Sequence, residues 1–263
     1  NGGDGVLVGD AYGVTIGGAS GNLISGNGGR GIAFTGSTGA GGSSVLGNLI
    51  GTDAPGLRPL GNSSHGVFLA DTNVSVGGRF ADINPQANVI AFNGGAGIAI
   101  ASGTSDPAFN NLVFGNAHLG IDLRADGAVE PNQPANPASG PNNLQNYPVF
   151  TSASSNGIST TVNFTLHAVP GTPYRVDIYQ SAACDASGNG QGRALWATAS
   201  FSTDASGNFT GSVPSVVLDI PGRVVSAVAT GATTGSSEFA ACALVAPPVP
   251  PPSPVHRRVS RAL

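Results

Sequence analysis

The chain has 263 residues, enough for two domains of ordinary size with a sizeable core. Glycine is abundant at 41 residues, charged residues make up 9% and methionine is absent, which predicts a turn-rich all-β protein because glycine serves turns and weakens helix interiors. A net charge of -4 without a clustered basic face before the last eight residues excludes a nucleic-acid partner, and no apolar run approaches the roughly 18 residues of a membrane span.

A single motif recurs through the first half of the chain. Asparagine is followed four residues later by glycine and then by apolar residues, and the motif occurs five times before residue 124. Its copies begin 26, 35, 31 and 23 residues apart, which is too irregular for helical repeat arrays but natural for strands joined by loops of varying length. The copies are residues 1–8, 27–34, 62–69, 93–100 and 116–123.

Each copy ends in a short strand whose side chains alternate between two faces. After the glycine, the first and third residues point to one face and the middle residue to the other. The first and third residues are apolar in every copy, so we expect the strands to stack on their equivalents in neighbouring repeats and to form a core there. The middle residues, which are expected to point outward, are Leu7, Ala33, Phe68, Ala99 and Asp122.

These strands predict a parallel β-helix over residues 1–123, because an open parallel sheet would need crossover helices and the sequence has none. The recurrent asparagines are expected to bond side chain to side chain along the axis as ladders, rather than to act in catalysis. Two longer loops, 49–61 and 79–87, interrupt the repeat. Loops that protrude from a rigid stack are sites of function and equally sites of tolerated variation.

The chain changes character twice after the last copy. Residues 124–148 are interpreted as a cap and linker, because the open edge of a strand stack has to be covered. Residues 149–245 contain five strand-like segments separated by turn signals, which predicts a small antiparallel, immunoglobulin-like β-sandwich. Residues 246–263 begin with a run of prolines and predict an extended, disordered tail.

The two cysteines, Cys184 and Cys242, both lie in the C-terminal part, each next to a strand-like segment. A disulfide between them would close a loop of about 58 residues, stabilise the fold by roughly 4 kcal/mol and indicate an oxidising compartment. We expect this pairing, and the alternative is two free, buried thiols.

Two runs carry a family resemblance. Gly-Asn-Leu-Ile-Ser-Gly-Asn at 21–27 and Gly-Asn-Leu-Ile-Gly-Thr-Asp at 47–53 resemble right-handed parallel β-helix repeats of the pectin-lyase-like superfamily, most closely those of bacterial secreted or surface proteins. In such proteins a junction like 119–123, followed by a segment like 140–149, leads into a sandwich-like domain with cysteine-bearing segments similar to those here. The resemblance implies an extracellular or cell-surface location. Because the chain opens inside a repeat, we also expect it to be part of a longer protein.

Enzymes of that superfamily act on acidic polysaccharides, and each type needs a recognisable set of residues. A lyase needs clustered carboxylates for calcium and a basic residue on one outward face, whereas a hydrolase needs two or three carboxylates within about 5 to 9.5 Å. The outward residues offer one carboxylate, Asp122. His65 resembles the histidine of a Gly-His-Gly motif in polygalacturonase-like hydrolases but lacks the partner Asp-Asp pair, and His118 lacks a third ligand for zinc. No catalytic residue is assigned.

The candidate binding residues fall into two groups. Asp122, Asp126 and Glu130 recur at intervals of four and could hold calcium, the alternative being a solvated polar cap. Sugar binding uses aromatic faces, and the aromatic residues expected to be exposed are Tyr12, Phe68 and Phe80.

The sequence therefore favours a non-catalytic extracellular surface or adhesion scaffold that contacts polysaccharides or cell-surface glycans along the β-helix and needs no cofactor beyond the calcium considered above. The alternatives are a polysaccharide lyase or glycoside hydrolase, and a purely structural segment of a larger protein.

Overall fold

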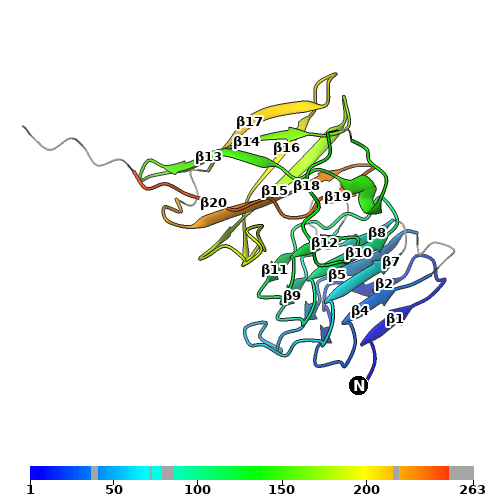
Figure 1. Ribbon diagram of the computed structural model, residues 1–263. Helices are drawn as coiled ribbons and strands as arrows, with labels where there is room; N and C mark the ends of the chain where they lie inside the picture. The colour runs from blue at the N-terminus through cyan, green and yellow to red at the C-terminus, as the bar shows by residue number, and fades with distance from the viewer. Residues whose placement is uncertain (37–40, 71–72, 79–85, 135, 216–218, 249–263) are drawn as a thin grey trace, which may run out of the picture.

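The computed structural model describes residues 1–36, 41–70, 73–78, 86–134, 136–215 and 219–248, and within them the chain is all-β (Figure 1). The described residues contain one helical segment, the 3-10 turn η1 (Pro141–Leu144). No helix among them is long and apolar enough to cross a membrane. Phe80 and the end of the proline-rich tail, residues 249–263, lie outside the described residues, so the predictions made for them stay predictions.

The described residues before 124 form three parallel sheets. The chain visits the three in rotation, except that the last repeat adds no strand to the second sheet, so each sheet is built from successive repeats. This arrangement is compatible with a β-helix. The first sheet has the order β1 (Val6–Val8), β4 (Ile32–Phe34), β7 (Val67–Ala70), β10 (Ile98–Ser102) and β12 (Ile121–Leu123). The second contains β2 (Thr15–Gly17), β5 (Ser43–Leu46) and β8 (Val74–Val76). The third contains β3 (Leu23–Ile24), β6 (Leu49–Ile50), β9 (Val89–Ala91) and β11 (Leu112–Phe114).

Equivalent residues of the motif pair with one another in the first sheet. Val6 pairs with Ile32, and the same register continues through Val67 and Ile98 to Ile121. The residues predicted to point inward belong to one hydrophobic cluster, which runs through the interior of the three sheets. The middle residues are less exposed than expected, because Ala33, Ala99 and Asp122 are all buried.

Two asparagine ladders fix the corners, as the sequence predicted. In one ladder the side-chain amide nitrogen donates to the side-chain oxygen of the next repeat at 2.8 to 2.9 Å, through Asn27, Asn62, Asn93 and Asn116. The other ladder runs through Asn22, Asn48, Asn88 and Asn111 at 2.8 to 3.1 Å. Each accepting oxygen also takes the backbone N–H of the donating asparagine. The register of the stack is therefore set by buried hydrogen bonds as well as by apolar contact.

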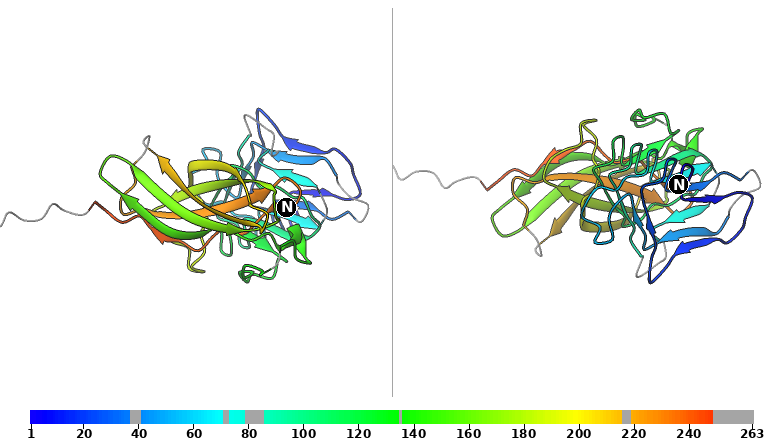
Figure 2. Two further views of the ribbon diagram at one scale, coloured as in Figure 1. Left: turned by 90° about the horizontal axis from the view of Figure 1, so that it is seen from above. Right: turned by 90° about the horizontal axis from the view of Figure 1, so that it is seen from below.

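The rest of the chain forms two antiparallel sheets with longer strands, which lie at one end of the parallel stack (Figures 1 and 2). One sheet contains β13 (Val149–Ser155), β14 (Thr160–His167) and β17 (Asn208–Ser215). The other contains β15 (Pro173–Ser181), β16 (Ala194–Ser202), β18 (Val224–Gly231) and β19 (Gly235–Ser236), with β20 (Ala243–Leu244) also paired to β18. Both sheets contribute to a second hydrophobic cluster that includes Phe164, Val176 and Trp196.

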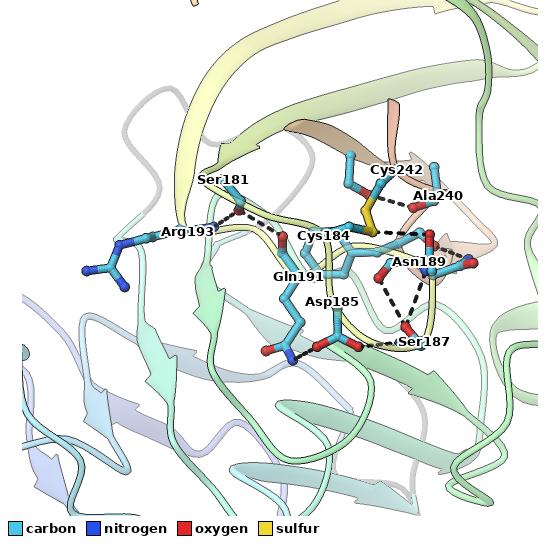
Figure 3. Close-up of a disulfide and its surroundings, with 12 residues drawn as sticks. Ser181, Cys184, Asp185, Ser187, Asn189, Gln191, Arg193, Ala240 and Cys242 are labelled. Atoms are coloured by element: carbon cyan, nitrogen blue, oxygen red, sulfur yellow. Dashed lines mark hydrogen bonds between the residues drawn. A yellow bond between two sulfur atoms is a disulfide. The ribbon is translucent and has the colours of Figure 1, made fainter. Parts of the chain in front are cut away.

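Cys184 and Cys242 form a disulfide with their Cα atoms 5.9 Å apart, which confirms the predicted pairing (Figure 3). It joins the loop between β15 and β16 to the segment before β20.

The antiparallel part closes the end of the parallel stack. Gln191 takes the place of a further asparagine in the first ladder, because its side-chain oxygen accepts both the backbone N–H and the amide of Asn116 at 3.0 and 3.1 Å. The carbonyl of Gly192 accepts the N–H of Val113 at 2.8 Å, and Glu238 Oε1 accepts the N–H of Leu123 at 2.9 Å. Within 124–148, the segment interpreted as the cap, Asn142 supplies a comparable bond to the N–H of Asp106. Closure is thus shared between that segment and the antiparallel sheets.

Candidate functional site

The stacked corners of the repeats enclose a cavity of about 280 Å³ next to the first sheet. We call it the corner cavity. Three consecutive corners contribute to it, together with the turn that follows β12. Its lining consists of Ser63, Ser64, His65, Gly94, Gly95, His118, Asp122, Ala125, Asp126 and Gly127.

The repeat explains why the cavity lies at this corner. His65 and His118 come from corners on either side of Gly94 and Gly95, so the middle repeat presents only backbone between them. A Cβ on Gly95 would lie 2.8 Å from His65 Nδ1 and 3.0 Å from the His65 backbone nitrogen. A side chain at this position would therefore displace His65, and glycine is required.

His65 is held as a neutral donor. The N–H of Ala96 donates to His65 Nδ1 at 3.1 Å, which places the ring proton on Nε2. Burial is the main cause that lowers the pKa of His65, and the charges of Arg30 and His118 lower the pKa further. Nε2 is therefore the hydrogen-bond donor of this side chain at neutral pH.

Asp122 carries the most perturbed carboxyl of the cavity. Its Oδ2 accepts the N–H of Gly127 at 3.0 Å, whereas its buried Oδ1 has no hydrogen-bond partner among the residues that the structure describes. Burial raises the pKa of Asp122 to about 6, and the neighbouring charge of Asp126 contributes in the same direction. As the pH falls through about 6, this carboxyl gains a proton and can donate a hydrogen bond, whereas the ionised form above that pH only accepts.

Glu238 lies behind the cavity and joins the two parts of the molecule. Its Oε1 accepts the N–H of Leu123 and its Oε2 accepts the N–H of Glu130, both at 2.9 Å. Burial, followed by the charges of Asp122 and Glu130, raises the pKa of Glu238 to about 8. The sequence reasoning assigned no role to this residue, although an acidic side chain directly before the apolar run 239–241 was a usable signal.

The three carboxylates predicted to bind calcium are divided between two environments. Asp122 and Asp126 both line the corner cavity. Glu130 instead forms an ion pair with Arg124 at 2.7 Å. Within the described part of the chain, no group of three or more His, Cys, Asp or Glu side chains is placed to hold a metal ion.

Of the aromatic residues predicted to bind glycans, the structure describes Phe68 and Tyr12, which lie in different parts of the stack. The ring of Phe68 lies next to the cavity, where the guanidinium carbon of Arg30 is 3.8 Å from its centroid and the ring of His65 stacks at 5.9 Å. Tyr12 is 79% exposed, but it lies between β1 and β2, in a different part of the stack. The sequence provides no reason to connect His65 with His118. In the structure both residues line the corner cavity.

A comparison of the sequence with protein-family models gives no match, and a comparison with curated proteins gives none either.

Proposed function

We propose that the protein is a non-catalytic extracellular or cell-surface scaffold that contacts glycans. In this proposal residues 1–123 form a right-handed parallel β-helix of the pectin-lyase-like type with about five coils, and residues 149–245 form an immunoglobulin-like β-sandwich. The rotation of the chain among three parallel sheets supports the first assignment. The two antiparallel sheets that share a core support the second. The disulfide favours an oxidising compartment, as an extracellular location requires.

The corner cavity is the observation that carries the proposal. It combines a neutral histidine donor with carboxyl acceptors around a backbone floor, and sugar hydroxyls both donate and accept hydrogen bonds. Because the asparagine ladder holds the surrounding corners, little ordering is needed on binding. Two carboxyl groups repel an anion, so a neutral sugar suits this cavity better than a uronate.

Calorimetric titration of the protein with neutral oligosaccharides tests the proposal. We expect His118→Ala to weaken binding about tenfold, because it removes one hydrogen-bonding side chain from the cavity lining. His167→Ala is the matched control, because His167 bonds to Asn208 and to the Pro134 carbonyl, away from the cavity. Binding is expected without any release of reducing ends. If no glycan binds, the proposal is wrong.

The burial of Asp122 favours one alternative, a glycoside hydrolase. A buried carboxyl whose pKa is raised to about 6 is suited to act as a general acid. Reducing ends released near pH 6, and lost in Asp122→Asn, would establish hydrolysis and overturn the scaffold proposal. Unsaturated products that require calcium and disappear with a chelator would instead establish a lyase and return attention to Asp122, Asp126 and Glu130.

A further inference from the structure

A second hollow, also of about 280 Å³, lies where the parallel stack meets the loop between β15 and β16. We call it the junction pocket. The end of the third parallel sheet supplies two phenylalanines, and the loop supplies the polar side chains. Its lining includes Phe92, Phe114, Asp185, Gln191 and Arg193.

Phe92 is the unusual residue of this pocket, because it has a φ of 61°. It directly precedes a corner asparagine, where two other repeats have Gly26 and Gly115 with φ of 67° and 64°. A left-handed backbone suits glycine and disfavours a bulky side chain, and such outliers collect at functional sites. The repeat alone would place glycine here, so the phenyl ring calls for a reason outside backbone geometry.

The neighbouring residues present this ring rather than bury it. Phe92 is half-buried and meets Phe114 edge to face, with 5.4 Å between ring centroids. Gly115 lets the Phe92 ring lie against the backbone, since a Cβ on Gly115 would be 3.0 Å from two ring atoms. The pocket therefore contains a fixed, partly exposed aromatic surface.

Arg193 provides a positive charge beside that surface. Its guanidinium carbon lies 4.5 Å from the centroid of the Phe114 ring. Arg193 is exposed and forms no ion pair with the carboxylates of the described residues. Figure 3 shows its side chain extending away from Asp185 and the disulfide. An arginine on an aromatic ring is well placed to bind a carboxylate with two hydrogen bonds.

The loop that carries Arg193 is held in place from several sides. Gln191 bonds to Asn116, and its amide donates to the carbonyl of His118 and to Asp185 Oδ2. Asp185 Oδ1 accepts the N–H of Ser187, and the residue directly before Asp185, Cys184, forms the disulfide. The bonds that close the end of the stack therefore also shape the pocket before any ligand arrives.

We propose that the junction pocket binds a sugar ring that carries a carboxylate. The apolar C–H face of the ring packs on Phe92, its carboxylate pairs with Arg193, and its hydroxyls reach Asp185. This inference rests on the proposed function in taking glycans as the ligands. It adds a second site that selects acidic sugars, whereas the corner cavity selects neutral ones.

Titration of the whole protein with an oligogalacturonide and with its carboxyl-reduced, neutral form tests the inference. We expect the acidic oligomer to bind at least about tenfold more tightly than the neutral one, and Arg193→Gln to remove this difference. Arg58→Gln is the matched control, because Arg58 is also exposed and lies in the loop after β6. Equal affinity of wild type and Arg193→Gln for the acidic oligomer would overturn the inference.

Phe92→Gly separates a binding role from a packing role. It restores the residue found at the same corner in other repeats, so we expect an unchanged or higher melting temperature together with about tenfold weaker binding of the acidic oligomer. A lower melting temperature with unchanged binding would make Phe92 a packing residue and overturn the inference.

Two further outcomes distinguish this inference from the proposed function. If His118→Ala abolishes binding of the acidic oligomer and Arg193→Gln does not, the ligand occupies the corner cavity and only the junction site is wrong. If neither form binds to the wild-type protein, and no other glycan does, both proposals fail.

Discussion

The parallel and antiparallel parts of the molecule both pair their backbone polar groups in sheets, but the register of the strands is set differently in each. Strands of the parallel stack are two to five residues long, too short to hold a register alone, so two asparagine ladders help to set it. Strands β13 to β18 are seven to nine residues long, and alternating burial along strands such as β14 sets their register. Both parts have an apolar core, to which the parallel part adds asparagine ladders and the antiparallel part adds a disulfide.

The difference makes the two parts unequal partners. A stack of repeats presents open backbone groups at its end, and here those groups bond to Gln191, Gly192 and Glu238. The antiparallel part has its own hydrophobic cluster. We therefore expect the antiparallel part to tolerate damage to the stack better than the stack tolerates damage to the antiparallel part.

Removal of one ladder side chain is expected to have the largest effect. Asn93→Ala leaves the backbone N–H and the side-chain amide of buried Asn62 without their acceptor. At about 1 to 3 kcal/mol for each of these two buried unpaired groups, the free energy of unfolding should fall by about 2 to 6 kcal/mol. Urea denaturation followed by circular dichroism measures this loss.

The position of the residue in the ladder provides the control. Asn27 is only half-buried and lies at the end of the ladder near β1. Asn27→Ala should therefore lower the free energy of unfolding by about 1 kcal/mol. Equal losses for Asn27→Ala and Asn93→Ala would show that burial along the ladder does not determine its strength.

Loss of the disulfide should destabilise the antiparallel part of the molecule. The bond links residues 58 apart in sequence, and in the chain-entropy model Cys184→Ser with Cys242→Ser lowers the free energy of unfolding by about 4 kcal/mol. The antiparallel strands should then unfold at lower urea concentration than in the wild type. An unchanged midpoint for the double variant would mean that the loop is held by its hydrogen bonds alone.

A comparison of prediction with structure shows which features a sequence can reveal. The parallel pairing and the ladders were predictable because the repeat places equivalent residues at equivalent positions. The contacts of Gln191 and Glu238 were not predictable, because these residues belong to no repeat and bond to partners 75 and 115 residues away in the sequence. Phe92 was visible as a departure from glycine at a corner, but only its φ shows what the departure means.

The candidate site was predicted in part for the same reason. Alternation placed Asp122 in the column of middle residues, but it could not show that the turn after β12 folds back over this carboxyl. The regular spacing in the sequence grouped Glu130 with Asp122 and Asp126. In the structure Glu130 instead forms an ion pair with Arg124.

The pH dependence of stability tests the contact through Glu238. Because its pKa is raised from 4.5 to about 8 in the folded protein, the folded state binds more protons than the unfolded state between these values. The free energy of unfolding should therefore fall as pH rises from about 4.5 to about 8, by on the order of 2 to 4 kcal/mol. Urea denaturation should show the slope in wild type, and Glu238→Gln should remove it between about pH 6 and pH 8, since the raised pKa of Asp122 contributes to the slope below about pH 6. A stability that rises over the same range in wild type would contradict the assignment.

Gln191→Ala should have a smaller effect than loss of Asn93 and is the sharpest test of the unequal partnership. The substitution leaves the backbone N–H and amide of Asn116 without an acceptor, at a cost of about 1 to 3 kcal/mol because water can enter at the end of the ladder. Hydrogen exchange should increase first at Asn116 and then along the ladder toward Asn93, while strands β14 and β15 stay protected. Gln133→Ala, which removes a half-buried glutamine side chain bonded to the Pro131 carbonyl, is the control. Faster exchange in β14 and β15 as well would show that the two parts unfold together, and the stack would then support the antiparallel sheets as much as they support it.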